Sequence, residues 1–105
     1  MYIETIVLKN DVSDEMIKKL TEVAEDAFDN RAGKVENSSA ESHTLIYQGD
    51  GEQVWQVISL GSLALWDNKE FVAYVEKWTY QDTEEPEENC NIIEVYSRTD
   101  KLLGN

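Results

Sequence analysis

The sequence predicts an α+β domain in which one N-terminal amphipathic helix packs on a curved antiparallel sheet of about five strands. Two observations predict this class. Apolar residues recur at steps of three and four in one early segment, and mostly at steps of two from residue 44 onward. The chain has 105 residues, 41% of them hydrophobic, which is enough for one core. We therefore expect a single domain over residues 1–105, with its core at about 2–98 and a tail at 99–105.

The first two predicted elements are a strand and a helix. Residues 2–8 are rich in aromatic and β-branched side chains, which favours a strand. Ser13 is a suitable N-cap for the helix that follows, and Gly33 is a suitable stop. The apolar stripe of this helix consists of Met16, Ile17, Leu20, Val23, Ala24, Ala27 and Phe28. The polar residues 34–42 have no periodicity, and we expect a connection there.

Four further strands are predicted in the second half of the chain. Residues 44–48 and 53–60 flank Gly49-Asp50-Gly51, a pattern typical of a β-hairpin turn. The runs 71–80 and 92–98 are also rich in β-branched and aromatic residues. This order of elements resembles the cystatin-type roll and, more loosely, the cone-shaped NTF2-like folds. The predicted hairpin tip has no counterpart of the Gln-Val-Val-Ala-Gly-like segment of cystatins, so inhibition of cysteine proteases is not predicted.

The charge of the chain limits what it can bind. It has 22 acidic and 9 basic residues, a formal net charge of -13. Such a chain repels nucleic acids and anionic membranes, so we expect neither as a direct partner and instead expect a basic protein. Residues 41–105 hold thirteen of the acids and only four bases. The acids are densest in residues 82–88, which we expect to form a solvated loop because Pro86 disfavours a helix there.

Several kinds of chemistry have no sequence support. Cys90 and His43 are the only thiol and the only imidazole, which excludes an internal disulfide and a zinc site rich in Cys and His. The acidic surroundings of Cys90 are expected to raise its pKa, so we do not predict an enzyme. No calcium-loop or phosphate-loop pattern occurs, and we predict no metal and no cofactor. The chain has neither a secretory signal nor a membrane-length apolar run, so we expect it in the cytoplasm.

Aromatic residues interleaved with carboxylates are the remaining feature. Trp and Tyr are enriched as interface anchors, and the surrounding charges steer a partner of opposite sign. The predicted partner-binding residues are Asp82, Glu84, Glu85, Glu87, Glu88, Trp78, Tyr80, Asp50, Glu52, Trp66 and Asp67. Each of these aromatic residues could instead belong to the core, and the acids could serve only solubility.

In size, charge and these acidic residues the chain resembles the small acidic immunity proteins of bacterial toxin systems, a class that includes barstar and the immunity proteins of colicins and of contact-dependent growth inhibition. The resemblance implies an inhibitor that plugs the cationic substrate groove of a toxin nuclease, with a ribonuclease favoured, as a monomer in a 1:1 complex. The alternative is a small cone-fold enzyme or ligand-binding protein that uses the concave face of the sheet. A basic partner that is not a toxin is a third possibility.

Overall fold

The fold combines helices with an antiparallel sheet. The computed structural model describes residues 1–29, 36–41, 43–85 and 90–102. The elements follow in the order β1 (Tyr2–Leu8), α1 (Asp14–Asp29), β2 (Glu36–Glu41), β3 (Thr44–Gly49), α2 (Glu52–Asp67), α3 (Lys69–Val72), β4 (Val75–Asp82), β5 (Cys90–Asn91) and α4 (Ile92–Leu102). The α+β class and the antiparallel sheet are confirmed, whereas the number of helices and the order of elements differ from the prediction.

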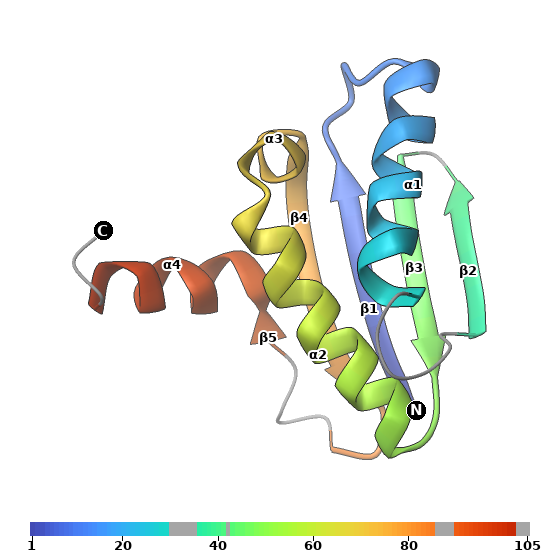
Figure 1. The fold of residues 1–105 in the computed structure, drawn as a ribbon, viewed down its shortest axis with the longest axis vertical. Helices are drawn as coiled ribbons and strands as arrows, with labels where there is room; N and C mark the ends of the chain where they lie inside the picture. The colour runs from blue at the N-terminus through green and yellow to red at the C-terminus, as the bar shows by residue number, and fades with distance from the viewer. Residues whose placement is uncertain (30–35, 42, 86–89, 103–105) are drawn as a thin grey trace.

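The sheet is built around its first strand. The strands lie in the order β2-β3-β1-β4-β5, each pair is antiparallel, and β5 has only two residues. Tyr2 lies opposite Gly49 on one side and opposite Asp82 on the other. Helices α1 and α2 cover the same face of the sheet, while α4 extends away from its β5 edge (Figure 1). A sheet with two covering helices is not the predicted one-helix roll.

The core lies between this sheet face and the two helices. Glu4, Ile6 and Leu8 alternate with half-buried residues along β1, so the even-numbered positions face the helices. The predicted apolar stripe of α1 is confirmed, with Leu20, Ala24 and Phe28 in the core cluster and the rest of the stripe packed against it. Ser13 Oγ accepts a hydrogen bond from Met16 N, as expected for an N-cap.

The predicted strand at residues 53–60 is wrong, because this segment is the first half of α2. Its buried residues Val54, Val57, Ile58, Gly61 and Leu65 follow helical spacing. The β-branched residues and Trp55 suggested a strand, since α2 has no charged residues between its ends to mark a solvent face. Gly51 does adopt a positive φ of 99°, but it opens a helix and not a hairpin.

Three other boundaries also differ from the prediction. Residues 69–72 form α3, whose first turn is capped when Asn68 Oδ1 accepts a hydrogen bond from Phe71 N, and β4 begins only at Val75. The predicted strand at 92–98 is helix α4, which also includes most of the predicted tail and starts where Asn91 Oδ1 accepts from Glu94 N. The predicted connection at 34–42 contains β2, whose pairing with β3 needs backbone groups only.

Candidate functional site: an acidic end of the sheet and a buried carboxyl group

The sheet brings two acidic segments together that lie about thirty residues apart in the sequence. Because Tyr2 is paired with both Gly49 and Asp82, the residues that follow β3 and β4 flank the start of β1. The N-terminus, the start of α2 and the end of β4 lie at the same end of the molecule (Figure 1). We call this surface the acidic end. Its members are Asp50, Glu52, Asp82, Glu84 and Glu85.

The pKa values of the Met1 amino group and the Tyr2 hydroxyl are both affected by these carboxylates. Asp50 Oδ1 lies 2.9 Å from the Met1 amino nitrogen, and this contact is the main cause that raises the pKa of the amino group. Burial raises the pKa of the Tyr2 hydroxyl, and the charges of Asp82, Glu84, Glu85 and Asp50 raise it further. The carboxylate contributions to both shifts indicate a local negative potential, as expected where several carboxylates converge.

The structure places the remaining predicted contact residues in different surroundings. Trp78 is 0% exposed and belongs to the core, so it offers no anchor at the surface. Trp66 is also buried, and with Asp67 it lies at the far end of α2 from the acidic end. Tyr80 is half-buried and stacks on Tyr2, with 6.3 Å between ring centroids. Glu87 and Glu88 lie outside the described residues.

A buried carboxyl group, Glu4, was not predicted as a functional residue. It is 0% exposed on the helix-facing side of β1. Trp78 Nε1 donates a hydrogen bond to Glu4 Oε1, and Ser62 Oγ in α2 lies 2.6 Å from the same oxygen. Burial raises the pKa of Glu4 to about 7, against the opposing effect of the hydrogen bonds from Ser62 and Trp78. The available signal was its position, two residues before the apolar Ile6 on the same strand face.

The geometry around Ser62 also allows an arrangement of hydrogens in which Glu4 is neutral. Ser62 Oγ lies close to two acceptors, Glu4 Oε1 and, at 2.7 Å, the carbonyl oxygen of Ile58. A hydroxyl has one hydrogen and can donate to only one of them. If Glu4 is protonated on Oε1, it donates to Ser62, which then donates to Ile58. Among the described buried side chains, Glu4 Oε2 is the one polar atom without a hydrogen-bond partner, which an ionised carboxylate would tolerate poorly.

A small pocket lies between α2 and α4, and we call it the α2–α4 pocket. Its volume is about 190 Å³. Its lining consists of Trp55, Ser59, Ser62, Tyr80, Cys90, Ile92, Val95 and Tyr96. Ser62 also contacts Glu4, so the buried carboxyl lies directly behind this wall. The charge of Glu4 adds to burial in raising the pKa of Cys90 and Tyr96, which line the pocket.

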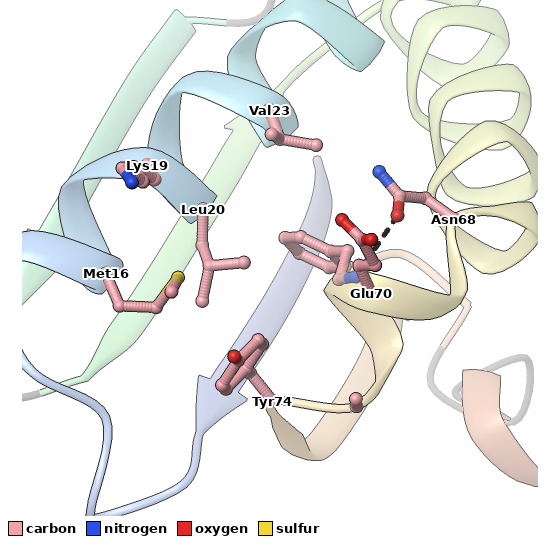
Figure 2. Close-up of a pocket in the computed structure, with 9 residues that line it drawn as sticks. Met16, Lys19, Leu20, Val23, Asn68, Glu70 and Tyr74 are labelled. Carbon is pink, nitrogen blue, oxygen red and sulfur yellow. Dashed lines mark hydrogen bonds between the residues drawn. The ribbon is translucent and has the colours of Figure 1, made fainter.

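A larger pocket of about 570 Å³ lies between α1 and α3, and we call it the α1–α3 pocket. In Figure 2, Met16, Leu20 and Val23 extend from α1 toward a wall that includes Asn68 and Tyr74. Lys19 and Glu70 are the charged residues of its lining. Its size suits a small organic molecule, and its mostly apolar walls offer binding contacts but few groups for chemistry.

The thiol and the imidazole do not meet in this fold. Cys90 is paired with Tyr80 in β4, on one side of β1. His43 precedes β3 on the other side, where its carbonyl accepts from Leu8 N and its Nε2 lies 3.2 Å from Val12 O. Burial and the charge of Glu4 raise the pKa of Cys90, in the predicted direction but from a different main cause. These two residues therefore do not form a nucleophile and base pair.

The described part of the chain lacks two further features. Within it, no group of three or more His, Cys, Asp or Glu side chains is arranged to hold a metal ion. None of the helices it contains has both the length and the apolar character needed to cross a bilayer.

Comparisons of this chain with protein-family models, with curated proteins and with solved structures gave no match.

Proposed function

We propose that this protein binds a basic protein and inhibits it by covering a cationic groove with its acidic end. The class of partner we propose is a toxin nuclease, with a ribonuclease favoured, held in a 1:1 complex. The observation that carries the proposal is the register of β1, which gathers carboxylates from the ends of β3 and β4 on one surface. A groove shaped for phosphates attracts such a surface, because spaced carboxylates resemble a phosphate backbone in charge.

The geometry suits fast capture of a partner. Glu52, Glu84 and Glu85 are exposed, so their charges extend into solvent and can steer a basic protein before contact. Such steering raises association rates and weakens with salt, since ions screen charges over about 10 Å at 0.1 M. The proposed inhibitor should therefore bind quickly at low salt and much more slowly at high salt.

The test is a binding experiment with two matched charge reversals. The tagged full chain, a Glu84→Lys/Glu85→Lys variant and a Glu22→Lys/Asp26→Lys variant of α1 are used to capture proteins from a lysate of the source cells at low salt. We expect a basic protein with nuclease activity to be retained by the wild type and the α1 variant only. Its purified form should cut RNA or DNA until the wild-type chain is added. Equal retention by both variants would remove the acidic end from the proposal.

A second candidate function is the binding of a small apolar molecule, and the α1–α3 pocket favours it. Helices α1 and α2 cover one face of the sheet, and in this pocket a ligand would bind between helices and not on the concave face of the sheet on which this alternative was expected. Catalysis is less favoured than binding, because Glu4 does not line either pocket described above. Thermal stabilisation by an apolar compound, abolished by Val23→Trp but not by Glu84→Lys, would support this candidate.

A further inference from the structure

The α2–α4 pocket has the size of a single side-chain group. A cavity of about 150 Å³ holds a benzene molecule in other proteins. At about 190 Å³, this pocket can take a planar guanidinium group together with the methylenes next to it. It is bordered by exposed apolar surface, since Trp55 is 46% exposed and Val95 is 39% exposed. A side chain with an apolar stem and a polar head therefore suits both its mouth and its interior.

The lining of the pocket favours a cation. Trp55, Tyr80 and Tyr96 contribute aromatic rings, whose faces attract cations. Glu4 lies behind Ser62, and the negative charge of its ionised form raises the pKa of both Cys90 and Tyr96. A cation in the pocket would stabilise the ionised form of Glu4, and the ionised form would in turn strengthen binding of the cation.

The same aromatic cluster already holds one cation within the chain. Lys69 Nζ lies 4.5 Å from the centroid of Trp66, and Trp66 packs edge-on against Tyr96 with 5.6 Å between centroids. This contact lies away from Trp55, because Trp66 is three helical turns further along α2. Tyr96, which lines the pocket, thus already neighbours a ring that contacts a cation within the chain.

The pocket and the acidic end are linked through Tyr80 and Tyr2. Tyr80 lines the pocket and stacks on Tyr2, and Tyr2 is surrounded by the carboxylates of the acidic end. Trp55 stands one helical turn after Glu52 on α2. A basic protein held by the acidic end would therefore present neighbouring side chains to the pocket.

We propose that the α2–α4 pocket receives one arginine side chain of the basic partner, stacked on Trp55 and the two tyrosine rings in front of Glu4. Arginine is favoured over lysine because its guanidinium group is flat, stacks on aromatic rings and is less strongly hydrated. The pocket would then give the complex an anchor that is less sensitive to salt than the acidic end. The inference rests on the proposed function, which supplies the basic partner.

The test uses a defined probe, N-acetyl-arginine amide, titrated into the isotope-labelled full chain and followed by NMR. We expect saturable shifts at the indole N–H of Trp55 and at the amides of Tyr80, Cys90 and Tyr96. The uncharged citrulline analogue should bind at least about tenfold more weakly, since it lacks the cation. Equal binding of both compounds, or shifts spread over the acidic end without saturation at Trp55, would overturn the inference.

Matched variants separate the pocket from the acidic end. Trp55→Ala should lower the affinity for the probe by about tenfold. It should cost little stability, because Trp55 is exposed. Leu63→Ala, on the same helix but outside the pocket lining, should leave binding unchanged. The Glu84→Lys/Glu85→Lys variant should still bind the probe at Trp55. If that variant no longer retains the basic protein, but the probe does not bind the pocket of the wild-type chain, the pocket inference fails and the proposed function stands.

Discussion

Helices α1 and α2 have the same length and cover the same sheet face, yet they differ in what they present to solvent. Eight of the sixteen residues of α1 are charged, whereas α2 has only Glu52 and Asp67, one at each end. In place of charges, α2 exposes Trp55, Leu60 and Leu63, of which Leu60 is 48% and Leu63 49% exposed. The outer face of α1 is therefore typical of a solvated helix, while that of α2 is typical of a surface that contacts another molecule.

The two helices also differ on their buried sides. The core residues of α1 are all apolar, whereas α2 places Ser62 against the buried carboxyl of Glu4. The structure thus combines, along one helix, an exposed apolar face and a buried polar contact.

The largest expected effect is that of Glu4→Gln, which removes the buried ionisable group under α2. The pKa of Glu4 is raised from 4.5 to about 7 in the folded state, so the folded chain binds more protons than the unfolded chain between these values. Stability should therefore be greatest below about pH 4.5, fall as the pH rises toward 7, and then level off. A shift of this size corresponds to about 3 kcal/mol of unfolding free energy.

Urea unfolding from pH 4 to 8 measures this effect as the difference between variant and wild type. From pH 4 to pH 8, the unfolding free energy of the Glu4→Gln variant should rise by about 3 kcal/mol relative to that of the wild type, because the amide stays neutral while the carboxyl ionises. Cys90 and Tyr96 near Glu4 have raised pKa values and stay neutral in this range, so they add no slope. Glu70→Gln, at an exposed position, is the control and should run parallel to the wild type. Parallel curves for Glu4→Gln would contradict the raised pKa.

The next effect concerns the contact between the two helices at Gly61. A Cβ atom built there would lie 2.2 Å from Phe28 Cδ1, and Phe28 is fully buried in α1. Gly61→Ala should therefore destabilise the protein by about 1–3 kcal/mol through overpacking. This loss should exceed the gain of up to about 1 kcal/mol that alanine brings to a helix. Ser59→Ala on the same helix should change the melting temperature little.

A double variant sharpens this prediction. Phe28→Leu removes the ring atoms that crowd position 61, so its combination with Gly61→Ala should cost less than the sum of the two single changes. Strict additivity would mean that the cost of Gly61→Ala does not come from crowding by the Phe28 ring.

A smaller effect is expected at the helix starts. Ser13 caps α1 through its side chain, whereas α2 begins at Gly51 without a side-chain cap. Ser13→Ala should destabilise the protein by about 1 kcal/mol, and Ser13→Asp should retain most of the stability. Gly51→Ser should not stabilise α2, because a φ of 99° is strained for any residue with a side chain. Thermal unfolding of the three variants checks both statements, and a stabilised Gly51→Ser would contradict the second.

The same comparison explains how much of the fold could be predicted. The α1 segment carries its period, its cap and its charged face in the sequence, so its start could be predicted closely, while the predicted stop at Gly33 lies outside the described residues. In α2 the exposed Leu60 and Leu63 hide the helical period, and Trp55 with its β-branched neighbours favours a strand. Asn91 caps the start of α4, and this signal was missed because the β-branched Ile92 and Ile93 favoured a strand there.

The candidate site could be predicted only in part. The sequence identifies Asp50 and Asp82 as members of acidic segments, but only strand register shows that both flank Tyr2. Trp78 was predicted at the surface because it lies close to the acidic run, while the pleat of β4 turns it into the core. The α2–α4 pocket depends on two segments that were predicted as strands, so it could not be foreseen.

The smallest expected effect on stability decides how the outer face of α2 is interpreted. Leu60→Gln and Leu63→Gln remove exposed apolar surface, so each should change the unfolding free energy by no more than about 0.5 kcal/mol. Both should also lower the binding of a dye that fluoresces on apolar surfaces, and sedimentation shows whether they abolish any pairing of two copies of the chain. A loss of about 2 kcal/mol would mean that these leucines already support the folded chain, and α2 would then differ from α1 in composition but not in role.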